Sequence, residues 1–520
     1  MKRQRTYRLI VIALPFFLLL LVEVVLRLVD FGYDNRLFIE AEDDRFLVMN
    51  RDISQKYFTI NQNATIGNQD VFYRRKPKNT LRFFVLGGSS ALGFPYMHNG
   101  SFARMLKYKL QFQFPDKNIE IINLSLTAIN SYTLYDFSKQ LINDQPDGIL
   151  IYAGHNEYYG ALGVASSSWL GSSPRWVRTL LVLRQLKLVQ VLDQLAAKFH
   201  SANPTLVDKN RTLLERMAAR QEIPYQSESY KSGVKQFQYN LGSMLRLFSK
   251  NGIPVFIGTL ASNHRGQKPL QEEHVLSQYD ANDEYRLAQK SFEQLAFKES
   301  KKHFFLAKEY DALRFRAPDE FNEIIEGYTV KMDGIFLVKT KERLEVNSAH
   351  EIIGNALMLE HVHPNLKGQK LLADAFYDAL VKNFAAFSNT ESEKLNIDLS
   401  KDYPATAFDS IYGELVVWKL KQQWPFNEQP EKPVYDQTNF EYEMAILFFF
   451  QKLNWGEAMQ MLNNHYIRKR DYENALRIVE QMCLELPHET VFLKQAASLC
   501  QRLGEAEKAK YYLKQLAYDQ

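Results

Sequence analysis

The sequence predicts an α/β fold, a three-layer α/β/α sandwich built on a parallel sheet, preceded by an apolar helix and followed by a helical region. From residue 81 onward, short apolar runs of the kind that form buried strands alternate with amphipathic stretches. Such alternation indicates parallel strands joined by helices that cover both faces of the sheet. An apolar stretch near the N-terminus and a repeated pattern near the C-terminus predict the two flanking parts.

The composition is that of a globular protein with more than one folded unit. The chain has 520 residues, 46% of them apolar and 24% charged, which is too long for one ordinary domain. The 64 basic and 60 acidic residues leave a formal charge of +4, too balanced to indicate a nucleic-acid partner. Both cysteines, Cys483 and Cys500, lie in the C-terminal helical region. We therefore expect no disulfide framework in the rest of the chain.

Residues 1–30 predict a basic cytoplasmic tail and a transmembrane anchor. Residues 9–29 form an apolar stretch interrupted by Glu23 and Arg27, which are spaced to pair on a helix. At about 1.5 Å per residue, such a helix is about 31 Å long, enough to cross a bilayer. We expect an uncleaved signal anchor rather than a cleaved signal peptide, because no small-Xaa-small site follows. Four basic residues precede the stretch and place the rest of the chain outside the cytoplasm, as in a bacterial cell envelope: Lys2, Arg3, Arg5 and Arg8.

The remaining sequence divides into four parts. Residues 31–80 lack sustained periodicity and are expected to form an extracytoplasmic stalk that packs partly on the next domain. Residues 81–387 are expected to form the α/β domain, with a helical insertion at about 158–231 that either covers a site or is purely structural. Residues 388–440 are polar and contain several prolines, as expected of a linker. Candidate strands in the domain cover residues 81–86, 119–124, 148–153 and 254–260, with helices at 102–114, 132–143 and 236–250.

Residues 441–520 are expected to form tetratricopeptide-like helical repeats. Three positions recur after 34 residues, the period of that repeat: Tyr472, Ala475 and Val479 return as Ala506, Ala509 and Leu513. Helix pairs of this kind can bind a protein partner. Fewer than three repeats are visible, so a helical cap docked on the rest of the chain, or on a second copy, is an equal alternative.

A serine in a glycine-framed turn follows the first candidate strand. The apolar run 81–86 leads into Gly87, Gly88, Ser89 and Ser90. Ligands of parallel sheets bind at the carboxyl ends of the strands, which makes Ser89 a candidate nucleophile. Ser90 is its nearest rival, and we expect it instead to cap the following helix through its hydroxyl.

Three later segments supply what such a serine needs. Residues 123–130 include Ala128, a candidate backbone donor at the end of the second strand, and residues 154–157 place Asn156 at the end of the third. Residues 360–365 read Glu-His-Val-His-Pro-Asn and offer an acid and a base. A serine, a histidine and a carboxylate are the groups that nucleophilic acyl transfer requires.

Together these segments resemble the four sequence blocks of the SGNH hydrolase superfamily, also called the GDSL lipases and esterases, in family order. The resemblance implies a flavodoxin-like domain and a serine esterase without cofactor. It implies Ser89 as nucleophile, His363 as general base and Glu360 as the acid that orients it. Ser89, Ala128 and Asn156 would form the oxyanion hole. Four positions depart from the family pattern: Gly88, Glu157 and Glu360 replace aspartates, and Ala128 replaces a glycine.

Alternatives at the site stay open. His361 competes with His363 as base, although the spacing from Glu360 and the following proline favour His363. Glu360, His361 and His363 could instead bind a metal together with His155, although no helical His-Xaa-Xaa-Xaa-His pairing supports this. Four residues are possible substrate contacts: Gly88, Gly154, His155 and Asn263.

We therefore expect a membrane-anchored, extracytoplasmic esterase or acylhydrolase. It would cleave an acyl or acetyl ester on a glycan or lipid through an acyl-serine intermediate. An O-acyltransferase of an envelope glycan would use the same serine. The altered blocks also fit a catalytically inactive binding or scaffold protein that acts through its repeats.

Overall fold

The computed structural model describes residues 2–58, 63–96, 99–166, 173–200, 212–218, 221–271, 279–388, 397–435 and 438–518. At its centre lies a five-stranded sheet with the order β5-β4-β6-β7-β8, in which every pairing is parallel. The predicted α/β fold is confirmed. The strands are β4 (Thr80–Gly87), β5 (Asn118–Asn123), β6 (Gly148–Tyr152), β7 (Val255–Gly258) and β8 (Ile335–Val338).

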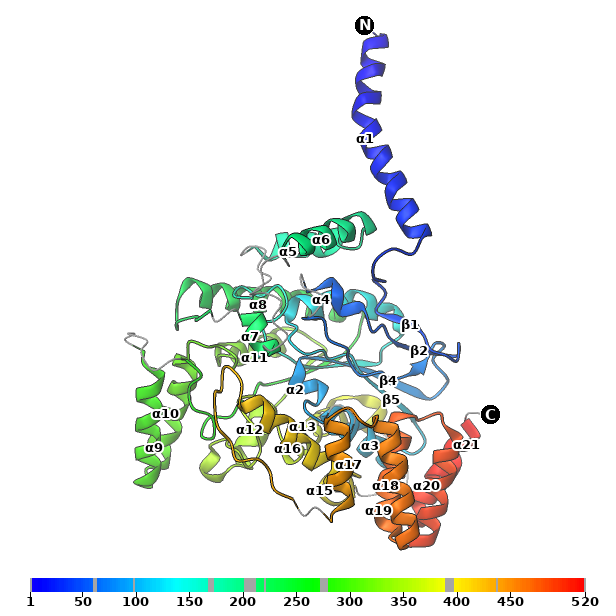
Figure 1. Cartoon of the computed structure of the whole chain (residues 1–520), viewed down its shortest axis with the longest axis vertical. Coiled ribbons are helices and arrows are strands. Elements are labelled where there is room, and N and C mark those ends of the chain that lie inside the picture. Colours follow the sequence, from blue (N-terminus) through cyan, green and yellow to red (C-terminus); the bar gives the residue numbers. More distant parts are fainter. Residues whose placement is uncertain are drawn as a thin grey trace.

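Helices cover both faces of this sheet (Figure 1). The central strand β4 is buried along almost its whole length, because it is apolar on both faces. Helices α3 (Phe102–Gln113) and α13 (Leu366–Asn383) pack on one face. The other face is covered by α4 (Ser131–Leu141), α8 (Glu228–Lys250) and α11 (Glu320–Lys331).

The segment expected to be a stalk is folded against the sheet domain. It contains a three-stranded antiparallel sheet of β1 (Phe38–Glu40), β2 (Phe46–Met49) and β3 (Phe72–Tyr73). The ring of Phe72 is buried and lies 5.6 Å from that of Phe84 in β4, centroid to centroid. The packing on the next domain is therefore extensive.

Helix α1 (Lys2–Leu28) projects away from the body of the molecule (Figure 1). Its stretch Val11–Leu28 is long and apolar enough to cross a membrane, and none of its apolar side chains is buried in the structure. Glu23 and Arg27 pair at 2.7 Å, as their spacing predicts.

The insertion after β6 contains α5 (Pro174–Leu183), α6 (Lys187–His200) and α7 (Leu213–Ala218), whereas its residues 167–172, 201–211 and 219–220 lie outside the described part. The sequence patterns did not predict β8 or the helical hairpin before it. The hairpin is formed by α9 (Ala281–Glu293) and α10 (Phe297–Tyr310). Shorter helices complete the domain: α2 (Ser89–Leu92), α12 (Thr340–Val346), α14 (Ala385–Ser388) and α15 (Leu399–Asp402).

The C-terminal helices pack on α3 rather than standing apart. Helices α19 and α21 begin 34 residues apart, at Tyr472 and Ala506, in keeping with the predicted period. The buried guanidinium of Arg104 in α3 lies 2.6 Å from the carboxylate of Glu485 in α19. The helices are α16 (Ala407–Lys421), which lies wholly within the residues expected to form a linker, α17 (Phe440–Phe449), α18 (Trp455–Lys469), α19 (Tyr472–Glu485), α20 (Thr490–Leu503) and α21 (Ala506–Tyr518).

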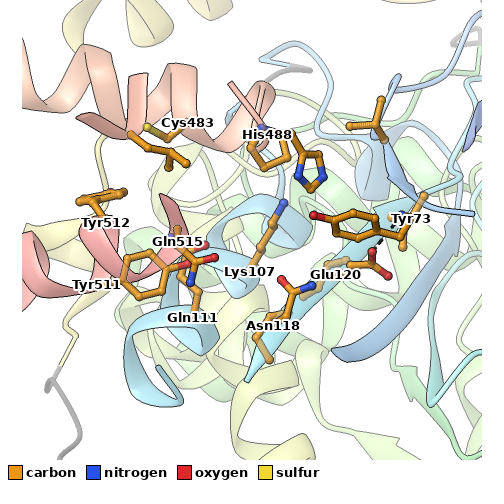
Figure 2. Close-up of a pocket in the computed structure, with 16 residues that line it drawn as sticks. Tyr73, Lys107, Gln111, Asn118, Glu120, Cys483, His488, Tyr511, Tyr512 and Gln515 are labelled. Atoms are coloured by element: carbon orange, nitrogen blue, oxygen red, sulfur yellow. Dashed lines mark hydrogen bonds between the residues drawn. The ribbon is translucent and has the colours of Figure 1, made fainter. Parts of the chain in front are cut away.

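Figure 2 shows a small pocket, of about 60 Å³, in the seam between these helices and the sheet domain. Lys107 of α3 and Glu120 of β5 line one side, and Tyr511 and Tyr512 of α21 line the other. The ring of Phe112 in α3 lies 4.7 Å from that of Tyr511. The C-terminal helices therefore form a cap docked on the domain, one of the two arrangements expected from the sequence.

Candidate active site

The candidate nucleophile begins the short helix α2 at the carboxyl end of β4. Gly87 and Gly88 precede Ser89, and neither glycine position has room for a larger side chain. A Cβ atom on Gly87 would lie 2.3 Å from the Cβ of Ala91, and one on Gly88 would lie 2.8 Å from Asn156 Nδ2. The two glycines therefore allow the backbone to turn tightly enough to present Ser89 at the edge of the sheet.

Ser89, His363 and Glu360 form a continuous hydrogen-bonded chain. His363 Nε2 lies 2.7 Å from Ser89 Oγ. The other ring nitrogen, Nδ1, is hydrogen-bonded to Glu360 Oε1, and the backbone N–H of His363 donates to the same oxygen at 3.2 Å. The longer glutamate arm therefore reaches the imidazole. The three residues predicted for catalysis are brought together in the order that a serine nucleophile requires.

His361 contacts the same carboxylate from the other side. Its Nδ1 is hydrogen-bonded to Glu360 Oε2, so that Glu360 lies between two imidazoles. The ring of His361 packs edge-on against Phe426, with centroids 5.4 Å apart. His363 is the histidine bonded to Ser89, and this geometry favours it over His361 as the base.

Burial lowers the pKa of His363 to about 3 and that of His361 well below its usual value. Both imidazoles are therefore neutral at pH 7, and a neutral His363 can accept the serine proton. The Glu360 carboxylate lies beside the ring, and a nearby negative charge stabilises an imidazolium. It stabilises that cation when proton transfer creates it.

The atoms that could bind a metal ion already make hydrogen bonds within the protein. One ligand atom from each of Glu360, His361 and His363 lies within 4.8 Å of the others. However, each carboxylate oxygen of Glu360 binds a histidine Nδ1, and His363 Nε2 binds Ser89. A metal ion would have to displace these bonds, so the donor set fits proton transfer better than metal binding.

Ser90 has a different role from the predicted helix cap. Its hydroxyl donates to the backbone oxygen of Val362 at 2.9 Å, which links the nucleophile turn to the histidine loop. Gln369 makes a second link, because its Nε2 donates to the Ser90 oxygen at 3.1 Å and its Oε1 accepts from the Phe102 N–H at 2.9 Å. Sequence reasoning missed Gln369, which stands one turn inside α13.

The oxyanion candidates line one cavity with Ser89. Ala128 has a φ of 58°, the left-handed conformation that a glycine at this position would adopt most easily. Within the described part of the chain, the Ala128 N–H and the Asn156 side-chain amide have no hydrogen-bond partner. Both residues line the cavity beside Ser89 and His363. Free donors beside a nucleophile are what a developing oxyanion requires.

Glu157 supports the loop that carries Asn156. Its buried carboxylate accepts hydrogen bonds from the Ser131 hydroxyl and from Gln236 Nε2, both at 2.6 Å, and from the Ser131 N–H at 3.1 Å. Burial raises its pKa to about 7. These bonds join the loop to α4 and α8. Sequence reasoning assigned no role to Glu157, although its position directly after Asn156 could have drawn attention to it.

The possible substrate contacts divide into two groups. Gly88, Gly154 and His155 line a small cavity beside Ser89, and His155 Nδ1 accepts from the Ala317 N–H at 3.2 Å. Asn263 lines neither this cavity nor the larger one with the catalytic chain. Its buried side chain donates to Asn355 Oδ1 and accepts from the Gly266 N–H, both at 2.8 Å, so its role is structural.

The larger cavity, of about 510 Å³, opens beside Ser89 and is walled mainly by apolar side chains. Its walls come from segments far apart in the chain: residues 64–66, the helix α7 of the insertion, and the end of α16. Sequence reasoning left open that the insertion covers a site, but it assigned neither residues 64–66 nor α16 to the site. The apolar residues that line it are Ala64, Ile66, Phe94, Ala128, Leu213, Leu214, Met217, Phe315, Val362 and Leu420.

Comparison with known proteins gives matches among solved structures. The chain matches no family model and no curated protein. It is similar to a GDSL-like lipase from Bacteroides thetaiotaomicron, at 13% identity and a TM-score of 0.30, over 60% of this chain and 92% of that one. A variant of an acetyl-xylooligosaccharide esterase from a Geobacillus species matches at 13% identity and a TM-score of 0.31, over 60% and 95%.

A psychrotrophic esterase from Pseudoalteromonas matches at 13% identity and a TM-score of 0.28, over 59% of this chain and 98% of that one. Identities and TM-scores this low leave the geometry of the site as the basis for assigning a function. That geometry combines a serine, a neutral histidine, a carboxylate and free donors beside an apolar cavity. It can perform nucleophilic acyl transfer.

Proposed function

We propose that this protein is a membrane-anchored serine esterase that cleaves an acyl ester of a lipid or glycan through an acyl-serine intermediate. The observation that carries the proposal is the hydrogen-bonded chain from Ser89 to His363 to Glu360 at the mouth of an apolar cavity. Because all three residues of this hydrogen-bonded chain are present and in contact, we favour an enzyme over a catalytically inactive binding protein.

In the proposed reaction, Ser89 Oγ attacks the ester carbonyl while His363 Nε2 takes its proton. The tetrahedral oxyanion accepts hydrogen bonds from the backbone N–H groups of Ser89 and Ala128 and from the Asn156 amide. Collapse of the intermediate releases the alcohol, which receives the proton from His363, and leaves the acyl group on Ser89. Water then attacks the acyl-enzyme by the same steps, and Glu360 stabilises the imidazolium each time.

The cavity supports an acyl group larger than acetyl. Its apolar walls would remove a hydrocarbon chain from water, which is worth about 0.8 kcal/mol per buried methylene. An acetyl ester would leave most of this volume unfilled. The alcohol part of the ester can belong to a glycan or to a lipid.

The apolar stretch of α1 supports an anchor, with the catalytic domain outside the cytoplasm, as in a bacterial cell envelope. The basic residues before this stretch favour a cytoplasmic N-terminus. A signal peptide would share these features, and the N-terminal sequence of the mature protein distinguishes the two.

The first test uses the full chain purified in detergent, with aryl esters of increasing acyl length and a serine-reactive phosphonate probe. We expect labelling of the parent, and no labelling of Ser89→Ala. His363→Ala should lower kcat/KM by about 10,000-fold or more. Ser229→Ala, at an exposed position near the start of α8, is the matched control and should keep both labelling and hydrolysis, because Ser229 lines neither cavity beside Ser89.

A parent that is neither labelled nor active on any ester would contradict the proposal. An added alcohol acceptor separates the hydrolase from the O-acyltransferase. A transferase would form the new ester faster than it releases free acid, since both reactions share the acyl-serine.

A further inference from the structure

The helical pair α5–α6 is fixed to the base of α1. The backbone N–H groups of Lys187 and Leu188, at the start of α6, donate to the two carboxylate oxygens of Glu23 at 2.9 and 2.8 Å. Arg27 pairs with Glu23 at 2.7 Å and donates to the Gln185 oxygen at 3.3 Å. A carboxylate on an apolar helix needs such partners, because burying it unpaired would be costly. The turn between α5 and α6 therefore supplies what Glu23 requires.

These contacts set the depth of the pair relative to α1. Glu23 lies inside the apolar stretch Val11–Leu28, five residues before its end. Five residues of helix rise about 7.5 Å, at about 1.5 Å each. If α1 spans a membrane, as proposed above, the start of α6 lies at the level of the last turn of the span. Interfacial amphipathic helices bury their apolar face to a similar depth of about 5–10 Å.

The pair has the side chains of an interfacial helix. Val177 and Leu181 are buried on one side, and Arg178 on α5 binds the Asn240 side chain of α8 at 2.7 Å. On the other side, six large apolar side chains are 39% to 58% exposed: Trp176, Val182, Leu183, Leu186, Leu192 and Leu195. Single exposed apolar residues are ordinary, but a row of six beside a membrane span marks an interaction surface.

The orientation of the pair fits a bilayer. In Figure 1, α5 and α6 lie over the body of the molecule at the level of the lower end of α1, and they run across the direction of α1. A helix that crosses a membrane and a pair that lies along its surface have this relation. Lys187 Nζ donates to the Tyr33 backbone oxygen at 2.8 Å, and the Tyr33 N–H donates to Gln190 Oε1 at 3.2 Å. These two bonds fix the segment that follows α1 to α6.

We propose that the α5–α6 pair lies in the interfacial region of the same bilayer that α1 spans, with its six apolar side chains among the lipid acyl chains. The catalytic domain then has two membrane contacts, and its orientation toward the membrane is fixed rather than free. The proposal rests on the anchoring function of α1. It commits to lipid as the occupant, because the neighbouring surface of α1 is itself apolar and exposed.

The test measures membrane depth at single spin labels on the full chain in lipid vesicles. Both native cysteines are buried, so a label attaches preferentially to an introduced cysteine. Leu183→Cys and Leu192→Cys report on the pair, and Leu19→Cys reports on α1. Leu513→Cys, 47% exposed on α21 and far from α1 in Figure 1, is the control of similar exposure. The readout is the ratio of collisions with oxygen, which dissolves in lipid, to collisions with a water-soluble nickel chelate.

We expect this ratio at positions 183 and 192 to exceed that at 513 several-fold and to approach that at 19. A low ratio at 183 and 192 with a high ratio at 19 overturns the inference and leaves the anchor standing. A low ratio at 19 refutes the anchor and, with it, this inference. Shielding of 183 and 192 from both reagents shows a protein occupant and also overturns it. Phosphonate labelling of Ser89 in each variant reports that the fold is intact.

Discussion

Ser89 and His363 are 274 residues apart in the chain, and their side chains lie 2.7 Å apart. The links from Ser90 to Val362 and from Gln369 to Ser90 hold the two loops together. Small changes in the distance between a nucleophile and its base cost large factors in rate, so these links matter for positioning. The sequence blocks predicted the residues of this hydrogen-bonded chain, whose catalytic roles stay a proposal. Gln369 was missed, because its role exists only where α13 meets the nucleophile turn.

Replacing Asn156 by alanine tests the oxyanion assignment. The loss of one preorganised donor should lower kcat by about 100- to 1000-fold and change KM little, since the donor acts mainly in the transition state. The measurement is steady-state hydrolysis of the best aryl ester. Asn251→Ala, at the exposed end of α8, is the control and should leave kcat unchanged. A kcat for Asn156→Ala within about threefold of the parent would remove Asn156 from the oxyanion hole.

At the scale of elements, the predicted strands and helices of the domain were recognisable because each has its own apolar pattern. The four predicted strands are present as β4 to β7. The four-residue β8 was missed, since so short an apolar run resembles part of a helix. The segment at 31–80 has no sustained pattern, but it folds because Phe38 and Phe72 pack on Phe84 of β4.

Helix α7 tests whether the apolar cavity holds the acyl chain. Leu213→Trp adds volume to the cavity wall and should favour short esters over long ones. We expect kcat/KM for a decanoyl ester to fall about 10-fold or more relative to that for a butyryl ester, because several buried methylenes lose their site. Leu287→Trp, on the exposed side of α9, is the control and should leave the ratio unchanged. Equal losses for both esters would show that the chain binds elsewhere.

At the scale of the whole molecule, the C-terminal helices share a buried core with the sheet domain. Arg104 is fully enclosed between the carboxylates of Asp70 and Glu485, at 2.7 and 2.6 Å, so it joins the N-terminal segment, α3 and α19. The tetratricopeptide-like repeats, and the binding of a partner in their groove, both stay predictions. The docking of these helices on the domain is a feature of the fold.

Weakening this seam should destabilise the protein as a unit. Glu485→Gln removes one of the two charges that face Arg104. It should lower the free energy of unfolding by about 1–3 kcal/mol, because a buried cation loses part of its compensation. Thermal and urea unfolding of the full chain measure the change. Glu489→Gln, exposed at the start of α20, is the control. Equal stability of the two variants would indicate that the C-terminal helices are not held by this contact.

The sequence by itself determined the α/β class, the apolar N-terminal helix and the residues of the hydrogen-bonded chain Ser89–His363–Glu360. Each of these follows from a local pattern, such as an apolar run, a glycine-framed turn or a short spacing between an acid and a histidine. The tertiary structure alone decided the cavity walls, the seam beside α3 and the placement of α5 and α6 at the base of α1. These features depend on contacts between segments more than one hundred residues apart in the chain. Such contacts are stabilised when two distant segments bury apolar surface against each other, and the local sequence pattern of either segment does not show which partner it will have.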